Sequence, residues 1–268
     1  MPTLETVTEA NKTPLCALFG LIISDCLPGS ICPQRGRARF FHFDFRKVPP
    51  VMKFYIDSAN ISLIESLMKT GIFYGVTTNP IILRASGIHC DRIGELAHRV
   101  ADLGAREIFL QSWGSSADAL LANGRRLAEI GETVVVKFPA TREGLEAAAA
   151  LAKAGARTCI TAVYSPFQAV LAAAAGAAYV APYLGRMNDA GRDGHELIAQ
   201  MSDALLGTES STEILAASIR SPEDTAVLAS NGVRHITLSP KVAELLFREQ
   251  LTIEAVEAFE AAAEELQR

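Results

Sequence analysis

A lysine ends a run of β-branched residues near the middle of the sequence. The run from Thr133 to Val136 leads directly into Lys137, and Pro139 follows two positions later. Successive apolar residues without alternation predict a strand that is buried on both faces. Burial lowers the pKa of a lysine, and a shift of about 3 units costs roughly 4 kcal/mol. A neutral amine of this kind is suited to attack a carbonyl and form an imine. The alternative is a lysine that extends to the surface and pairs with a carboxylate.

The elements that must position this lysine alternate between strand-like and helix-like segments. Eight strands are expected, at residues 53–57, 73–76, 107–111, 134–136, 157–161, 178–183, 213–217 and 234–238. Helices are expected from 58 or 60 to 70, within 89–103, at 115–130 and 143–154, from 165, from 194 to 206, and at 221–229, 240–247 and 253–267, with a loop at 185–194. Such alternation indicates an α/β fold with a parallel sheet, and eight units favour a closed (β/α)8 TIM barrel with an extra C-terminal helix.

In a barrel of this kind, the carboxyl ends of the strands form one mouth where the chemistry takes place. The polar residues expected at these strand ends are Asp57, Thr77, Asn79, Gln111, Lys137, Thr161, Tyr183, Arg186 and Ser218. We therefore expect these side chains to converge around Lys137.

The composition excludes several other classes of protein. The chain of 268 residues is 49% hydrophobic and 21% charged, which is typical of a soluble globular protein. Its net charge of −5 does not attract nucleic acid or acidic membranes, and no phosphate-binding glycine motif occurs. The five histidines show no metal-ligand spacing, so no metal site is expected. Cys90 and Cys159 stand far apart in the sequence, which is typical of reduced thiols in the cytoplasm.

Residues 1–51 differ from the rest and lack clear periodicity. We expect them to be a disordered extension, or an upstream start before Met52, and residues 52–268 to form a single catalytic domain. A signal peptide is the alternative, because residues 15–23 are apolar. That run is too short to span a bilayer, and Glu5 and Glu9 replace the expected basic flank.

Six motifs, in order, resemble the small transaldolase family. They are Phe54-Tyr-Ile-Asp57, Gly75-Val-Thr-Thr-Asn-Pro80, Val135-Val-Lys137-Phe-Pro139, Thr161-Ala-Val-Tyr164, Ala181-Pro-Tyr-Leu-Gly-Arg186 and Leu215-Ala-Ala-Ser-Ile-Arg220. The resemblance covers essentially all of residues 52–268. It implies a Schiff base on Lys137, sugar-phosphate substrates, and no metal or organic cofactor. It also implies a ring of identical subunits in which the C-terminal helix packs on a neighbour.

The family contains transaldolases, which transfer a dihydroxyacetone unit between sugar phosphates, and fructose-6-phosphate aldolases, which release it. The transaldolase pattern resembles Glu, Asn, Ser and Phe where this chain has Gln111, Cys159, Ala181 and Tyr183. These four positions match the aldolase branch. Ile81 departs from that branch, in which Ser is common. The resemblance thus implies cleavage of fructose 6-phosphate to dihydroxyacetone and glyceraldehyde 3-phosphate, with transaldolase activity or a non-catalytic sugar-phosphate-binding barrel as alternatives.

The resemblance implies a catalytic role for five residues. Lys137 attacks the C2 carbonyl of the ketose, and Tyr183 moves protons through a water that Gln111 and Thr161 orient. Asp57 takes the C4 hydroxyl proton or accepts hydrogen bonds from the sugar. The alternatives are an aromatic ring that only lines the mouth for Tyr183, and a carboxylate at a helix N-terminus for Asp57.

Five further residues are expected to bind substrate. Thr77 and Asn79 would hold the donor, although both could simply shape an Asn-Pro turn. Arg186, Ser218 and Arg220 together indicate a phosphate site, because guanidinium groups bind phosphate through two hydrogen bonds. A lone arginine would instead form a surface ion pair.

Overall fold

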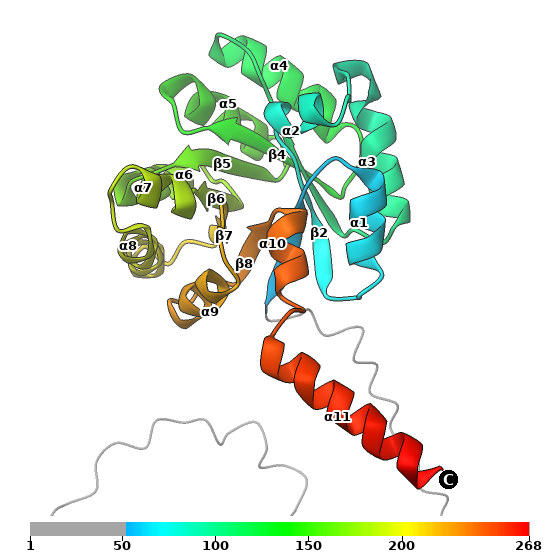
Figure 1. Ribbon diagram of the computed structural model, residues 1–268. Coiled ribbons are helices and arrows are strands. Elements are labelled where there is room, and N and C mark those ends of the chain that lie inside the picture. The colour runs from blue at the N-terminus through cyan, green and yellow to red at the C-terminus, as the bar shows by residue number, and fades with distance from the viewer. Residues whose placement is uncertain (1–51, 268) are drawn as a thin grey trace, which may run out of the picture. The chain divides into compact units, whose positions relative to one another are not determined.

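The computed structural model describes residues 52–267, and the expectation for residues 1–51 therefore lies outside the described residues. Eight parallel strands close into a barrel in chain order, with β1 paired to both β2 and β8 (Figure 1). The strands are β1 (Lys53–Asp57), β2 (Phe73–Thr77), β3 (Glu107–Gln111), β4 (Val134–Pro139), β5 (Thr158–Val163), β6 (Tyr179–Pro182), β7 (Glu213–Ala216) and β8 (His235–Leu238). The fold is a TIM barrel, as the alternation of strands and helices predicts.

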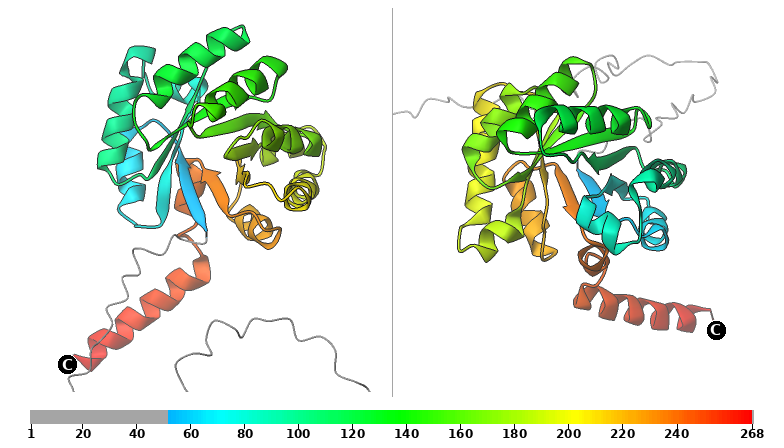
Figure 2. Two further views of the ribbon diagram at one scale, coloured as in Figure 1. Left: turned by 180° about the vertical axis from the view of Figure 1, so that it is seen from behind. Right: turned by 90° about the horizontal axis from the view of Figure 1, so that it is seen from above.

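Helices surround the barrel on its outside (Figures 1 and 2). They are α1 (Ile61–Met68), α2 (Pro80–Ala85), a short 3-10 helix (Cys90–Arg92), α3 (Ile93–Asp102), α4 (Ala117–Ala128), α5 (Arg142–Lys153), α6 (Pro166–Ala174), α7 (Leu184–Asp189), α8 (Gly194–Gly207), α9 (Glu223–Ser230) and α10 (Pro240–Leu245). One more helix, α11 (Gln250–Leu266), follows them. The main core fills the space between strands and helices. Within residues 52–267, none of the helices is long and apolar enough to cross a bilayer.

Two short helices differ from the sequence predictions. α2 begins directly after Asn79, whose side-chain oxygen accepts hydrogen bonds from the amides of Ile81 and Ile82 at 2.9 and 3.0 Å. α7 occupies the first part of the segment expected to be a glycine- and aspartate-rich loop, and that prediction is wrong. Buried Leu184 and Met187 anchor α7 to the core, although glycine and aspartate surround them.

The end of the barrel opposite the mouth holds a buried polar group, here called the floor cluster, formed by Tyr55, Glu107, Tyr179 and His235. The hydroxyl of Tyr55 donates to Glu107 Oε2 at 2.6 Å, and that of Tyr179 donates to Glu107 Oε1 at 2.9 Å. Arg157 Nη1 also donates to Oε1, at 2.6 Å. Because Tyr55 has given its one proton to Glu107, it accepts from His235 Nδ1 at 3.1 Å. The carboxylate of Glu107 is therefore fully hydrogen-bonded inside the barrel.

The floor cluster shifts the pKa of its own members. Burial raises the pKa of the Tyr55 and Tyr179 hydroxyls, and the negative charge of Glu107 raises both further. Burial lowers the pKa of His235 to about 4, with a further contribution from Lys53. His235 is therefore neutral at pH 7, which fits its role as a hydrogen-bond donor to Tyr55.

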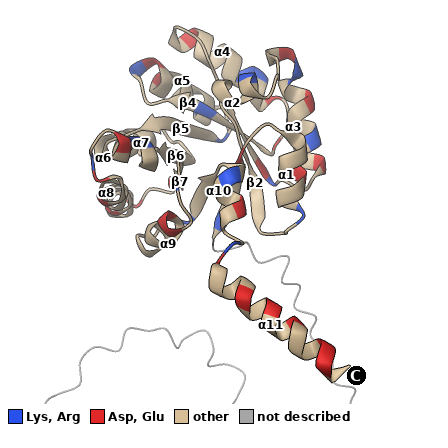
Figure 3. Ribbon diagram, in the orientation of Figure 1, with Lys and Arg blue, Asp and Glu red and all other residues tan. Residues whose placement is uncertain are grey.

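The last helix, α11, stands apart from the barrel (Figures 1 and 2). None of its residues is buried, and the side chains of Phe259 and Leu251 are 69% and 73% exposed. Its charged residues are all glutamates (Figure 3). A helix with exposed apolar side chains is stabilised by packing on another surface.

Candidate active site

Lys137 lies within β4 and points into the barrel near the mouth. Only 5% of the residue is exposed, so the expected burial is found. Its Nζ donates a hydrogen bond to the backbone carbonyl of Thr78 at 3.0 Å, rather than reaching a carboxylate at the surface. Gln111 lies opposite Lys137 on the neighbouring strand β3. The amine is thus held inside the barrel by the backbone at the end of β2.

Asp57 belongs to a chain of hydroxyl groups beside this lysine. Thr77 Oγ1 donates to Asp57 Oδ1 at 2.6 Å and lies 2.6 Å from Thr237 Oγ1. A threonine hydroxyl has a single proton, so when Thr77 donates to Asp57 it must accept from Thr237. Burial raises the pKa of Asp57, while the charge of Lys137 and the Thr77 hydrogen bond oppose this rise. Asp57 is therefore a carboxylate whose proton affinity is increased by its surroundings.

Thr237 was not among the residues expected at the site. It lies in β8, one residue before the strand ends, and is almost fully buried. The rule that selects polar residues at the ends of apolar strands would have included it. Its hydroxyl is connected to Asp57 through that of Thr77.

Tyr183 directly follows β6 and forms an isolated bridge with Ala217. Its hydroxyl lies 2.9 Å from Thr161 Oγ1, and its ring packs edge-on against Tyr164 with the ring centres 5.8 Å apart. Burial raises the pKa of Tyr164, and the neighbouring Tyr183 adds to the rise. Tyr183 and Thr161, which are expected to act on one water molecule, thus lie within hydrogen-bond distance of each other.

A cavity of about 230 Å³ opens at the mouth of the barrel. Seven of the ten expected site residues line it: Asp57, Asn79, Lys137, Tyr183, Arg186, Ser218 and Arg220. The other three do not line it. Thr77 and Thr161 each hydrogen-bond a residue that does, and Gln111 is the strand neighbour of Lys137.

Several of the expected binding residues also have structural partners. The side chain of Asn79 caps α2, a structural role that differs from the Asn-Pro turn considered for it. Arg220 forms an exposed ion pair with Asp189 at 2.7 Å, the alternative considered for a lone arginine. Ser218 adopts a left-handed conformation with φ of 59°, and its carbonyl accepts from the amide of Gly185 at 2.9 Å. The three residues expected at the phosphate site therefore share one rim of the cavity, and two of them are held by neighbouring residues.

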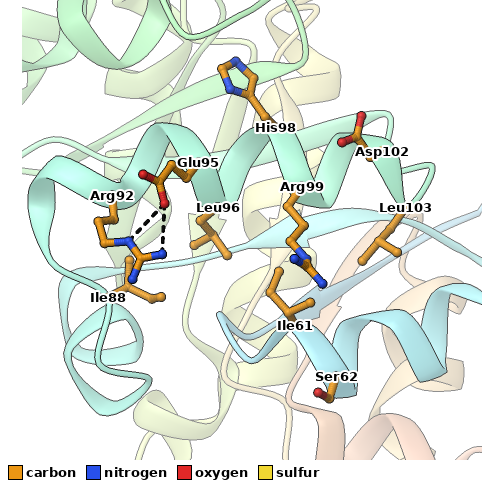
Figure 4. Close-up of a pocket in the computed structure, with 10 residues that line it drawn as sticks. All are labelled: Ile61, Ser62, Ile88, Arg92, Glu95, Leu96, His98, Arg99, Asp102 and Leu103. Atoms are coloured by element: carbon orange, nitrogen blue, oxygen red, sulfur yellow. Dashed lines mark hydrogen bonds and ion pairs between the residues drawn. The ribbon is translucent and has the colours of Figure 1, made fainter.

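A larger cavity of about 900 Å³ lies between α1 and α3 on the outside of the barrel (Figure 4). Arg92 and Glu95 form an ion pair along one side of it at 2.9 Å, and His98 points away from the other labelled side chains. No expected site residue lines it. Among residues 52–267 no group of three or more histidine, cysteine or acidic side chains is arranged to hold a metal.

The comparisons with known proteins agree with the geometry. Residues 54–268 match the family described as transaldolase/fructose-6-phosphate aldolase. The chain belongs to this family. It is accordingly an enzyme of the Schiff-base (class I) type, and the family implies sugar-phosphate substrates.

Two relatives in the family are named as probable transaldolases, after one of the family's two activities. A probable transaldolase of Aquifex aeolicus (strain VF5) is 40% identical over 208 residues, which make up 78% of this chain and 94% of that protein. A probable transaldolase 1 of Bacillus cereus is 40% identical over 211 residues, covering 78% of this chain and 95% of that protein. These names support the transaldolase alternative better than the expected aldolase.

A solved structure is similar in fold alone. A mutant flavocytochrome b2 with pyruvate bound has a TM-score of 0.52 at 14% identity, and the match covers 72% of this chain and 58% of that one. At this identity the likeness supports the barrel architecture only.

Proposed function

We propose that this enzyme forms an imine between Lys137 and the C2 carbonyl of fructose 6-phosphate and cleaves the C3–C4 bond. One observation supports the proposal most directly: Lys137 is buried, and it lines the mouth cavity together with Asp57. The cavity wall thus supplies both a nucleophile and a carboxylate. A family member with these groups at the carboxyl ends of its strands has the arrangement that Schiff-base cleavage requires.

The proposed reaction begins when Nζ of Lys137 adds to C2 and water leaves, which gives an iminium. The C4 hydroxyl then loses its proton to Asp57, the C3–C4 electron pair moves toward the iminium nitrogen, and glyceraldehyde 3-phosphate departs. Because burial raises its pKa, Asp57 is a stronger base than an exposed aspartate. The remaining enamine takes a proton at C3 to give the iminium of dihydroxyacetone.

Release of this three-carbon unit requires water to attack C2 of the iminium. The hydroxyl pair of Tyr183 and Thr161 can hold such a water, with Gln111 nearby on β3. When the Tyr183 hydroxyl gives its proton to C3 of the enamine, the resulting phenolate takes a proton from the water that attacks C2. General acid–base help of this kind contributes about 10² to 10⁴ in rate. The pair supports release of free dihydroxyacetone, and hence the aldolase, as the main candidate.

Transfer of the three-carbon unit to a second aldose phosphate is the second candidate. The names of the relatives favour it. The two candidates share every step up to the enamine and differ only in whether water or an aldehyde takes the three-carbon unit. The products formed in the presence of an acceptor aldehyde therefore distinguish the two candidates.

Borohydride reduction with fructose 6-phosphate tests the imine. We expect the reagent to inactivate the enzyme and to label only the peptide that contains Lys137. Lys137→Ala should abolish the label, whereas Lys153→Ala, which removes an exposed lysine of α5, should leave it unchanged. Labelling that persists in Lys137→Ala would show that another amine carries the substrate.

We further propose that copies of this chain form a ring in which α11 packs on a neighbour, in the cytoplasm. The exposed apolar side chains of α11 support the first part. Cys90 and Cys159, which are free thiols within residues 52–267, support the second.

A further inference from the structure

His195 and Asp224 form a pair at the mouth side of the barrel that the reaction described above does not use. His195 is the second residue of α8, and Asp224 is the second residue of α9, a helix that packs beside α8 (Figure 1). His195 Nε2 lies 3.0 Å from Asp224 Oδ1, and their side chains are only 27% and 17% exposed. α9 follows β7, and α8 follows β6 after the short helix α7, so both helix starts lie on the mouth side of the barrel.

The second oxygen of Asp224 fixes the backbone of the loop that carries Arg220. Asp224 Oδ2 accepts hydrogen bonds from the amides of Arg220 and Ser221 at 3.2 and 3.1 Å. Ser221 Oγ in turn accepts from the amide of Asp224 at 3.4 Å. This reciprocal arrangement resembles a capping box, and it sets the direction in which residue 220 leaves the loop.

Two contacts orient the side chain of Arg220, which is 61% exposed. Its Nη2 donates to Asp189 at 2.7 Å, and a Cβ added at Gly185 would lie 2.5 Å from its Nε. The guanidinium therefore lies between α7 and the loop, on the rim of the mouth cavity beside Ser218. The position of the guanidinium therefore depends on the conformation of the loop, which the hydrogen bonds to Asp224 stabilise.

We propose that His195 and Asp224 are positioning residues for Arg220, and through it for the phosphate group of the substrate. This inference rests on the proposed function. His195 donates to Asp224 and keeps the carboxylate turned so that its other oxygen faces the amides of the loop. Without that donor, Asp224 turns toward water, the loop loosens, and Arg220 no longer meets the phosphate in a fixed geometry. Neither residue touches the reacting carbon atoms.

The test compares two aldehydes that differ only in phosphate. In the direction of synthesis, with dihydroxyacetone as donor, kcat/KM is measured for glyceraldehyde 3-phosphate and for glyceraldehyde. We expect His195→Leu to lower the ratio of these values about tenfold, the size associated with loss of one charge-assisted hydrogen bond. The change should lie in KM for the phosphorylated aldehyde, with kcat/KM for glyceraldehyde unchanged.

A conservative variant separates positioning from general packing. The amide nitrogen of a glutamine reaches about as far as the Nε2 of histidine, so His195→Gln should restore the ratio to within about twofold. Asp224→Asn is a second variant that weakens the same contacts from the other side and should lower the ratio as His195→Leu does. Inorganic phosphate, used as a competitive inhibitor, should bind His195→Leu more weakly by the same factor.

Asp193→Ala is the matched control. It removes the side chain that caps α8, an acceptor for the amide of Glu196 at 3.0 Å, and leaves the His195–Asp224 pair in place. We expect its aldehyde ratio to be unchanged even where its melting temperature falls. An unchanged ratio in His195→Leu and Asp224→Asn, or an equal fall in Asp193→Ala, would overturn the inference. Borohydride trapping with dihydroxyacetone reports on Lys137 separately, so loss of trapping in the unmodified enzyme would instead refute the proposed function.

Discussion

Each hydroxyl group around Lys137 has a single proton and can donate only one hydrogen bond, which restricts its role. Thr77 commits its proton to Asp57 while that carboxylate is ionised, and Thr237 then donates to Thr77. The Tyr183–Thr161 pair is not committed in this way, because either hydroxyl can be the donor. A water at the mouth can therefore exchange protons with this pair, while Asp57 takes the proton of the C4 hydroxyl of the sugar.

Two substitutions test which reaction the pair supports. Tyr183→Phe removes the phenolic proton but keeps the ring, so it should suppress release of dihydroxyacetone by roughly 10²-fold or more. Gln111→Glu restores the acid of the transaldolase pattern and should raise the ratio of transfer to release further. The two changes lie in one small site, so their effects on this ratio should couple rather than add.

The measurement is the amount of sedoheptulose 7-phosphate formed, relative to free dihydroxyacetone, with erythrose 4-phosphate present as acceptor. Tyr164→Phe is a suitable control, because it removes a hydroxyl from the ring beside Tyr183 and leaves the Tyr183–Thr161 pair in place. If the unmodified enzyme already favours transfer strongly, the second candidate is the correct one.

At the scale of single residues, the sequence predicts which side chains gather at the mouth better than it predicts what they bond. Lys137 and Tyr183 follow from strand ends and motifs. Thr237 was missed because none of the six motifs covers β8, although the expected strand at 234–238 ends where β8 ends. The capping by Asn79 and the ion pair of Arg220 depend on helices, α2 and α7, whose existence the sequence did not indicate.

At the scale of elements, the alternation of strands and helices is a strong signal because the strands are largely buried and α1 to α10 each bury apolar side chains. The short helices are a weak signal. α2 and α7 each have six residues, and single buried side chains or caps decide them. The floor cluster was also missed, since it joins residues of four strands through the barrel interior, which no local pattern encodes.

The floor cluster makes stability depend on pH. His235 has a pKa of about 4 in the folded protein, against an ordinary value of 6.5. The unfolded chain therefore binds the proton first as pH falls, and stability is lost between pH 6.5 and about 4. The loss at His235 amounts to at most about 3 kcal/mol. Urea unfolding between pH 4 and 7 should show this slope.

His235→Gln removes the titrating ring and should flatten the dependence of unfolding free energy on pH in this window. His98→Gln replaces a histidine on the outer face of α3 and should leave the slope intact. An unchanged slope in His235→Gln would assign the loss of stability to other groups.

At the scale of the whole molecule, residues 1–51 lie outside the family match, which begins at residue 54. A chain that begins at Met52 should keep the activity and melting temperature of the full chain, since the barrel elements all follow that residue. Thermal unfolding and the aldehyde assay check this directly. A large loss in either would show that residues 1–51 contribute to the folded protein.

The exposed helix α11 predicts that assembly depends on the C-terminus. Removal of residues 250–268 should reduce the oligomer to smaller species, as measured by light scattering after size-exclusion chromatography. Phe259→Glu places a charge on a side chain that is 69% exposed here and should act in the same direction. Glu264→Gln on the same helix is the control. An unchanged mass in the truncated protein would place the interface elsewhere.

Closure of the barrel has a consequence for synthesis on the ribosome. β8 completes the circle by pairing with β1, and the floor cluster joins Tyr55 to His235, which stand 180 positions apart. Translation adds roughly 5–20 residues per second, so roughly 10–40 s pass between the synthesis of β1 and that of its last partner strand, β8. During that time the nascent sheet has two unpaired edges and Tyr55 lacks His235, which makes the incomplete chain a substrate for chaperones. α11 is made last, after β8 has supplied the closing strand, so the contacts that we propose between α11 and another copy can form after its own barrel has closed.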